Sequence, residues 1–185
     1  MTPNFCRTLL TLLCAVLYLN AAAQSVDDIT PKPVQVIKAK RGHVTLDQRA
    51  QIVYDDQFAE QAAFLQELLE AQSGLKLQAY SSAANQPKAS HHIRLVFDNK
   101  QVNKAEMYTL TVAGKDVTLR AQDTGGMVYG IQTLLQLFPL KPVKEVKIPD
   151  VEIVDYPRFG YRGMHLDVVR HMFPVSFIKK YIDYL

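Results

Sequence analysis

The position of the two cysteines is the strongest constraint on how this chain can fold. Cys6 and Cys14 both lie near the amino terminus, and no cysteine follows them. The rest of the chain can therefore have no disulfide, no cysteine metal ligand and no cysteine nucleophile. It must be held together by burial of apolar side chains. A chain of 185 residues with 48% hydrophobic residues has enough of them for a domain of ordinary size.

The first 23 residues have the pattern of a secretory signal. A single basic residue, Arg7, precedes an apolar run over residues 9–19, and three alanines follow at positions 21–23. This order predicts a signal peptide over residues 1–23 that is cleaved after Ala23. We therefore expect an exported protein in the periplasm, at the cell surface or in the medium. The apolar run is short for a bilayer span, so we expect no stable membrane span after cleavage. A short membrane anchor is the alternative.

The charge of the chain excludes one class of partner. The sequence has 21 Lys and Arg residues against 18 Asp and Glu residues, which gives a formal net charge of +3. The basic residues are spread along the chain and form no strong patch. We therefore expect no nucleic-acid partner. A charged content of 21% also fits a folded protein and not a disordered one.

Hydrophobic periodicity predicts an α+β domain over residues 24–150. Apolar residues follow a helical period over residues 56–73 and 124–138, with Asp55 or Asp56 as an N-cap and Gly74 as a C-cap of the first helix. Alternating patterns predict strands over residues 34–40, 43–53, 92–97, 108–112 and 117–121, with a turn at Gly42 and His43 and a loop over residues 80–90. We expect a mostly antiparallel sheet with two helices on one face.

Three glycines in the second predicted helix indicate that this helix lies close to the sheet. Gly125, Gly126 and Gly130 occur within it, although each glycine disfavours a helix by about 1 kcal/mol relative to alanine. Glycines at such positions let a helix lie close to a sheet. A phosphate-binding loop is disfavoured because the glycine spacing fits neither phosphate motif.

Three prolines between residues 139 and 149 predict a boundary, with a second unit over residues 151–185. We expect a strand over residues 161–168, a loop over residues 170–174 and an amphipathic helix that begins at Pro174 or Val175. A strand, a loop and a helix form the first unit of a (β/α)8 barrel. One such unit cannot close a barrel, so we expect the barrel to be incomplete and the chain to be truncated.

Charged residues gather in the segment YRGMHLDVVRHMFP over residues 161–174. A metal site could use His165, Asp167 and His171, but no second carboxylate is near them in the sequence, and we expect no metal. A paired-carboxylate site is also disfavoured, since only Asp167 is suitably placed. Asp167 is better interpreted as the ion-pair partner of Arg170 or Arg162. The guanidinium of Arg162 offers a planar fork of donors that suits two adjacent hydroxyls or an anion.

Several short motifs together resemble glycoside hydrolase family 20, the β-N-acetylhexosaminidases. The start of the catalytic barrel in that family is similar to DYPRF (155–159), YRG (161–163), LDV (166–168) and RHMFP (170–174). The non-catalytic N-terminal domain of the family is similar to YTL (108–110), VTL (117–119) and GIQTLLQL (130–137). The resemblance covers most of the chain after the signal.

The resemblance implies a function and a role for Arg162. The arginine that matches Arg162 hydrogen-bonds the hydroxyls at positions 3 and 4 of the terminal sugar, so the implied partners are glycans that end in N-acetylhexosamine. Asp167, Arg170 and His171 are expected to support the end of the strand. The implied hydrolysis retains configuration and needs no cofactor. The acetamido oxygen of the sugar attacks the anomeric carbon, an aspartate orients it, and an adjacent glutamate is the general acid and base.

The chain contains no Asp-Glu dipeptide, so we assign no catalytic residue within it. We expect the chain to be the front part of a secreted exo-acting β-N-acetylhexosaminidase and to be inactive by itself. One alternative is a stand-alone carbohydrate-binding or interaction module with a vestigial barrel segment. Another is a barrel hydrolase of different specificity that uses the same arginine.

Overall fold

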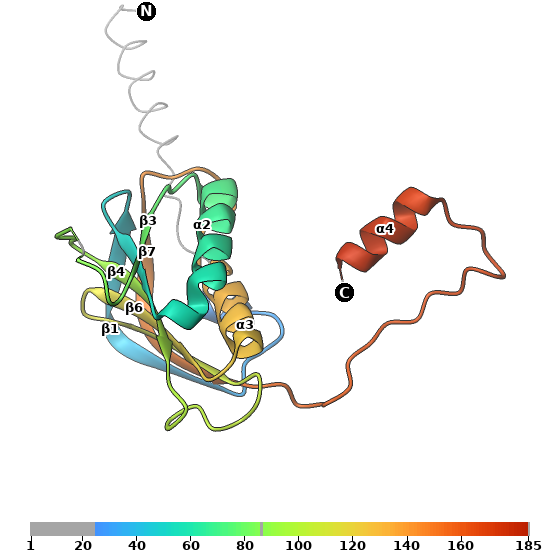
Figure 1. Ribbon diagram of the computed structural model, residues 1–185, viewed down its shortest axis with the longest axis horizontal. Coiled ribbons are helices and arrows are strands. Elements are labelled where there is room, and N and C mark those ends of the chain that lie inside the picture. The colour runs from blue at the N-terminus through green and yellow to red at the C-terminus, as the bar shows by residue number, and fades with distance from the viewer. Residues whose placement is uncertain (1–24, 86, 185) are drawn as a thin grey trace, which may run out of the picture.

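A seven-stranded mixed sheet forms the centre of the computed structural model, which describes residues 25–85 and 87–184 (Figure 1). The signal peptide predicted over residues 1–23 lies outside the described residues. The strands are β1 (Gln35–Asp47), β2 (Gln51–Tyr54), β3 (Gln78–Ser81), β4 (His92–Phe97), β5 (Tyr108–Ala113), β6 (Asp116–Ala121) and β7 (Glu145–Asp155). The helices are η1 (Val26–Asp28), η2 (Asp56–Phe58), α2 (Ala59–Ser73), α3 (Thr124–Leu135) and α4 (Val175–Asp183).

The strands lie in the order β1-β7-β5-β6-β4-β2-β3. The β1–β7, β7–β5 and β5–β6 pairs are antiparallel, whereas the β6–β4, β4–β2 and β2–β3 pairs are parallel. The α+β class is confirmed, but the prediction of a mostly antiparallel sheet is wrong. The reason is that α2 carries the chain from β2 back to the same edge, where β3 adds in parallel, as crossover connections do.

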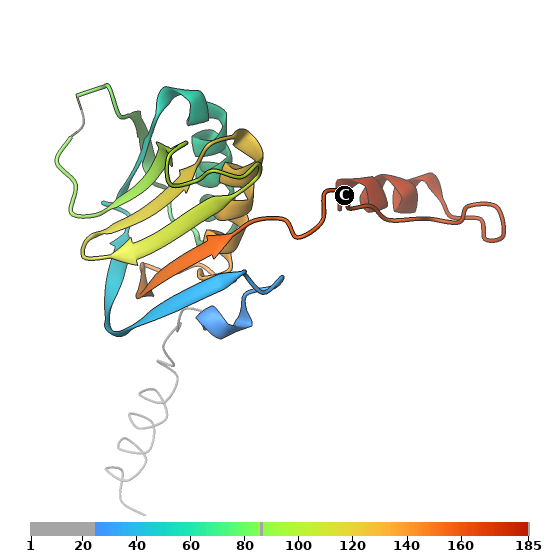
Figure 2. The same cartoon turned by 90° about the horizontal axis from the view of Figure 1, so that it is seen from below.

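Both long helices of the domain pack on one face of the sheet, as predicted (Figures 1 and 2). Leu65 and Leu69 of α2 and Ile131 of α3 are fully buried in the core. The strands alternate accordingly, so that Ile93 and Leu95 of β4 are buried while the residues between them are not. The opposite face of the strands therefore carries polar side chains. Within the described part of the chain, no helix is long and apolar enough to cross a membrane.

Two glycines allow α3 to lie directly against the sheet. A Cβ on Gly130 would lie 2.8 Å from Cδ2 of Leu119 on β6. A Cβ on Gly126 would come closer than 3.0 Å to the backbone oxygen of Met107, just before β5. The structure therefore bears out the close approach that the glycines predicted. The helix itself ends at Leu135, three residues before the predicted end.

The edge of the sheet differs from the prediction around Gly42. A single strand, β1, runs through the turn predicted at Gly42 and His43, and the pairing register with β7 shifts between Lys38 and His43. Gly42 has a φ of 123°, which only glycine adopts readily. The glycine therefore marks a bulge inside a long strand and not the end of a strand. The short strand β3 was also missed, because it falls partly in the polar segment predicted as a loop.

The C-terminal end of the first helix was predicted correctly, but its N-terminal cap was not. Gly74 has a left-handed φ of 72°, and its N–H donates to the carbonyl of Glu70 at 3.0 Å. Asp55 makes no capping bond. Its carboxylate instead accepts hydrogen bonds from the Ser82 hydroxyl and the Phe97 N–H, both at 2.8 Å. Asp55 therefore ties the segment after β3 to the end of β4.

The last part of the predicted boundary, residues 145–149, belongs to the strand β7 (Glu145–Asp155). This strand lies between β1 and β5, and it includes Pro149, which pairs with His43 where the register shifts. A proline is tolerated there because the regular ladder is interrupted. The sheet therefore extends to Asp155, five residues past the boundary predicted at residue 150. The division into two domains stays a prediction.

The segment after β7 extends away from the sheet (Figures 1 and 2). The strand predicted over residues 161–168 is wrong, since residues 156–174 contain neither strand nor helix. A parallel strand needs neighbours with which to pair, and this segment pairs with none of the described strands. The predicted helix is present as α4 (Val175–Asp183), and none of its side chains is buried. The barrel unit itself is not confirmed.

The glycine contacts of α3 predict unequal losses of stability in two alanine variants. Gly126→Ala should lower the free energy of unfolding by about 1–3 kcal/mol, because the new methyl group would overlap the backbone of Met107. In Gly125→Ala the Cβ would lie 3.2 Å from Cγ of Glu106, a side-chain contact that a small shift relieves, so this variant should lose less stability than Gly126→Ala. Urea unfolding of both variants checks the expectation. Equal stability of the two variants would contradict it.

Candidate functional site

A cavity of about 560 Å³ lies beside α3, at the end of the sheet where β5 begins and β7 ends. Its walls combine aromatic rings with hydrogen-bonding side chains. The aromatic and hydrogen-bonding residues of this lining include Glu106, Tyr108, Tyr129, Gln132, Thr133, Gln136, Asp155, Tyr156, Phe159 and Arg162. Pockets of this size with a few convergent polar groups hold small ligands.

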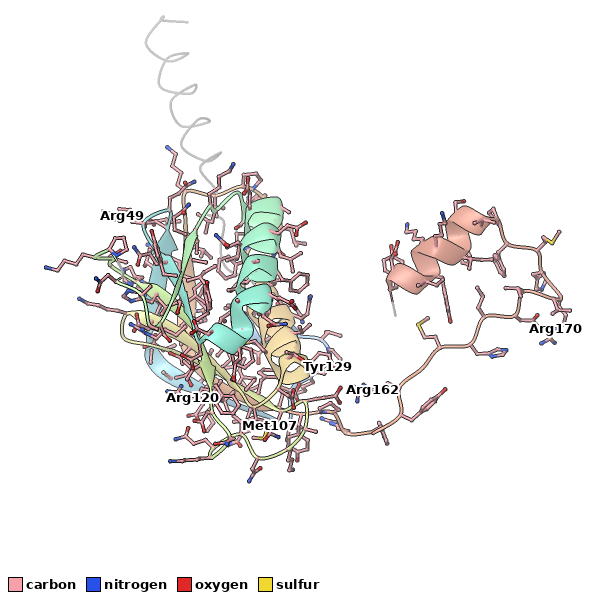
Figure 3. The ribbon with its side chains drawn as sticks, in the orientation of Figure 1. Arg49, Met107, Arg120, Tyr129, Arg162 and Arg170 are labelled. Atoms are coloured by element: carbon pink, nitrogen blue, oxygen red, sulfur yellow. The ribbon has the colours of Figure 1, made fainter. Side chains whose placement is uncertain are left out.

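Arg162 closes one side of the cavity through hydrogen bonds to the domain (Figure 3). Its Nη2 lies 3.0 Å from each carboxylate oxygen of Glu106 and 3.0 Å from the Tyr129 hydroxyl. Its Nη1 donates to the carbonyl of Phe159 at 2.8 Å. The bonds to Glu106 and then to Tyr129 raise the pKa of Arg162 above its usual value. The side chain stays 43% exposed, so its donors remain accessible from solvent.

The carboxylate of Asp123 places Glu106 for this contact. Its Oδ1 accepts from the Gly126 N–H at 2.7 Å and thereby caps α3. Its Oδ2 accepts from the Glu106 N–H at 2.8 Å. Glu106 has a φ of 57°, which is uncommon for a residue with a side chain. The backbone of Glu106 is thus held in an unfavourable conformation by the same carboxylate that begins the helix.

Tyr108 forms the buried floor of the cavity. It is 2% exposed, and its hydroxyl lies 2.6 Å from Oγ1 of Thr133 and 3.4 Å from Oδ2 of Asp155. Burial raises the pKa of Tyr108 well above its usual value, which keeps the phenol neutral at ordinary pH. Asp155 also accepts from the Val34 N–H at 3.0 Å. The floor is therefore a polar network that joins β5, β7 and α3.

The other predicted site residues do not gather around Arg162. Arg170 lies far along the extended segment, away from the cavity (Figure 3). Asp167 pairs with the Arg170 side chain, one of the two partners expected for it, and accepts from the Arg170 N–H at 3.1 Å. These bonds from Arg170, the backbone bond first, hold the pKa of Asp167 below its usual value. His171 is exposed. Support of a strand end by these three residues stays a prediction.

Sequence reasoning missed Glu106, Tyr129 and Tyr108 as members of the site. Glu106 lies in an ordinary polar loop, and Tyr129 follows no motif. One signal was available, because an Asp immediately before a predicted helix start, as Asp123 is, predicts a cap. No sequence pattern predicts that the second carboxylate oxygen of Asp123 accepts a hydrogen bond from the backbone of Glu106. In the part of the chain that is described, no three His, Cys, Asp or Glu residues form a metal-binding group.

A family model described as "Glycosyl hydrolase family 20, domain 2" matches residues 27–156, which include all seven strands. This chain therefore belongs to glycoside hydrolase family 20.

Relatives with curated names agree with this assignment. The chain is 31% identical over 188 residues to a "Beta-hexosaminidase" of Porphyromonas gingivalis, an alignment that covers 92% of this chain and 24% of the relative. It is 40% identical over 79 residues to a "Beta-hexosaminidase" of Vibrio furnissii, which covers 42% of this chain and 13% of that protein. The chain thus spans about a quarter of the first of these relatives.

Solved structures of the family share the fold. The β-N-acetylhexosaminidase of Streptomyces coelicolor superposes with a TM-score of 0.71 at 27% identity, over 88% of this chain and 33% of that one. A Streptomyces plicatus β-hexosaminidase variant in complex with its product, N-acetylglucosamine, superposes with a TM-score of 0.67 at 26% identity, over 89% and 33% of the two chains. The similarity therefore extends over most of this chain and about a third of theirs.

Burial of Tyr108 predicts an alkaline dependence of stability. A tyrosine ionises near pH 10 in an unfolded chain, whereas the pKa of Tyr108 is raised in the folded state. Its contribution is therefore fully present below about pH 10 and is lost as the pH rises further. In Tyr108→Phe the free energy of unfolding should fall by about 1 kcal/mol at pH 8, and its decrease between pH 9 and 11 should be shallower than in the wild type.

The control for this experiment is Tyr161→Phe, because Tyr161 is 89% exposed. This variant should keep the slope of the wild type, as measured by urea unfolding at each pH. A slope that is unchanged in Tyr108→Phe would show that another group causes the alkaline loss.

Proposed function

We propose that the protein of which this chain forms a part is an exported exo-acting β-N-acetylhexosaminidase. It removes terminal N-acetylhexosamine from glycoconjugates or chitooligosaccharides by retaining, substrate-assisted hydrolysis. The observation that carries the proposal is the family match over residues 27–156, together with the Porphyromonas gingivalis relative. That alignment leaves out only 8% of the chain (100 − 92), so it includes residue 162, which lies further than that from either end.

The chemistry of Arg162 supports its proposed role in holding the substrate. Its guanidinium already binds two carboxylate oxygens and a phenol hydroxyl at hydrogen-bond distance. The same planar donors suit two adjacent hydroxyls of a sugar. In the complete enzyme we propose that Arg162 binds the hydroxyls at positions 3 and 4 of the terminal sugar, in exchange for its bonds to Glu106 and Tyr129.

The reaction itself needs groups that this sequence does not contain. The proposed mechanism uses an aspartate to orient the acetamido group and an adjacent glutamate as general acid and base, and the chain has no Asp-Glu dipeptide. Glu106 cannot replace that pair, because its neighbours in the sequence are Ala105 and Met107 and no aspartate is adjacent to it. We therefore propose that the Asp-Glu pair belongs to a barrel strand outside this sequence.

A carbohydrate-binding module is the second candidate function, and the cavity beside α3 supports it. The tyrosine and phenylalanine rings around the cavity offer apolar faces to a sugar, while Gln132, Gln136 and Glu106 offer partners for its hydroxyls. A module of this kind would bind N-acetylglucosamine without hydrolysing it.

The purified 185-residue chain should release no product from an aryl N-acetyl-β-glucosaminide, because it lacks the general acid. A colorimetric assay over several hours measures this, with a full-length relative as the positive control. Turnover by the chain would refute the proposed location of the catalytic pair. Saturable binding of N-acetylglucosamine without turnover, measured by calorimetry, would favour the binding module.

Replacing Arg162 in the full-length enzyme should lower kcat/KM while leaving the enzyme folded. Arg162→Lys keeps the charge but removes the fork, and we expect kcat/KM to fall about 10- to 100-fold, as for the loss of a charge-assisted hydrogen bond. The matched control is Arg49→Lys, because Arg49 is an exposed arginine bonded to Asp47 at the other end of the domain (Figure 3). Equal kcat/KM values in the two variants would exclude Arg162 from substrate binding.

A further inference from the structure

A second cavity, of about 320 Å³, lies at the end of the sheet opposite to Arg162. Its lining includes His91, His92, Arg94, Lys115 and Asp116. Asp116 pairs with Ala113 at the β5–β6 hairpin, whereas Tyr108 of the first cavity begins β5 at the other end. His92 and Arg94 alternate with the buried residues of β4, so they lie on the sheet face that the helices do not cover. This cavity is separate from the proposed substrate site.

Asp116 fixes two of the basic side chains. Its Oδ1 lies 3.1 Å from Nδ1 of His92, and its Oδ2 accepts from Nε of Arg94 at 3.1 Å. Burial acts to raise the pKa of Asp116, but the hydrogen bonds from Arg94 and His92 outweigh it and hold that pKa below the usual value. The carboxylate therefore stays charged. Among the described residues, the terminal nitrogens of Arg94 and the ammonium of Lys115 have no acceptor or ion-pair partner.

The hydrogen bonds of both histidines determine which ring nitrogen is free. Nδ1 of His91 lies 2.9 Å from the carbonyl of Lys115, and Nδ1 of His92 faces the carboxylate of Asp116. Both oxygens only accept, so each Nδ1 carries a proton and donates. Each Nε2 then accepts when the ring is neutral and donates when the ring is protonated. An ordinary imidazole changes charge between pH 5 and 8, and each ring that gains a proton would give the cavity one more donor.

The charge of the cavity follows the same change. With neutral histidines, Arg94 and Lys115 exceed Asp116 by one positive charge (2 − 1), and with both rings protonated the excess is three (4 − 1). Two charged groups outside this lining are Asp47, which His91 affects electrostatically, and its partner Arg49. They pair with each other at 2.6 Å and so add no net charge. The pKa of Asp47 is lowered mainly by its hydrogen bond from Arg49, and to a smaller extent by His91.

We propose that this cavity binds a tetrahedral oxyanion, a phosphate or sulfate group that is either free or carried on a small sugar, and that binding strengthens as His91 and His92 become protonated. The donors match such a group, since Arg94 presents a planar fork and Lys115 a point charge. The volume of about 320 Å³ is near the lower limit of small-molecule pockets, which leaves room for a monosaccharide beside the anion.

Calorimetric titration of the full chain with inorganic sulfate and with glucose 6-sulfate, in a buffer free of phosphate, tests the proposal. Both probes carry the same sulfate group. The probe with the lower Kd therefore shows whether the cavity binds a free oxyanion or one carried on a sugar. We expect saturable binding at pH 5.5 that is about tenfold weaker at pH 8, since tenfold corresponds to one charge-assisted interaction. The double variant His91→Gln/His92→Gln should lose this pH dependence.

Lys115→Glu should weaken binding at pH 5.5 about tenfold or more, and Lys141→Glu is its matched control. Both lysines are exposed, and both variants change the net charge equally, but Lys141 lies outside the cavity lining. An equal loss of affinity in the two variants would show that the protein attracts sulfate non-specifically through its net charge, and it would overturn the proposal. The absence of saturable binding of either probe at pH 5.5 would also overturn it, with circular dichroism used to verify that each variant is folded.

Discussion

The contact between α3 and the sheet is the interaction on which the rest of the domain depends. Gly126 and Gly130 remove the side chains that would separate the helix from β5 and β6. This approach brings Thr133 within 2.6 Å of the buried Tyr108 hydroxyl and lets Asp123 reach both the start of α3 and the Glu106 backbone. The cavity beside α3 and the contact of Arg162 both follow from it, because their walls are carried by the helix and by the loop it holds.

The elements with a strong periodic pattern could be predicted from the sequence. The strand β4 and the β5–β6 hairpin fall where alternation placed them, and Gly74 ends α2 because its left-handed conformation suits glycine. The failures share a cause, which is that long-range pairing decided the local structure. Local sequence predicts a turn at Gly42, but β7 pairs with β1 on both sides of this residue. Local sequence likewise predicts a boundary at Pro149, but this residue pairs with His43 inside the sheet.

The candidate site was predictable to a smaller extent. Arg162 stood out because a guanidinium in an apolar segment has few structural reasons to be there. Its partners Glu106 and Tyr129 are 56 and 33 residues away in the sequence, and no local pattern connects them. The strand expected around Arg162 was wrong for a related reason. A parallel strand is stable only between neighbours, and the described residues supply none for this segment.

The central place of β7 determines when this domain can form during synthesis. Among the described strands, β1 pairs with β7 alone, and the end of β1 and the start of β7 are 98 positions apart (145 − 47). A ribosome must therefore release nearly the whole domain before β1 finds its partner. The exposed edge of β1 would remain open to wrong pairing during that interval. Chaperone protection of the nascent chain would matter most until residue 155 has emerged.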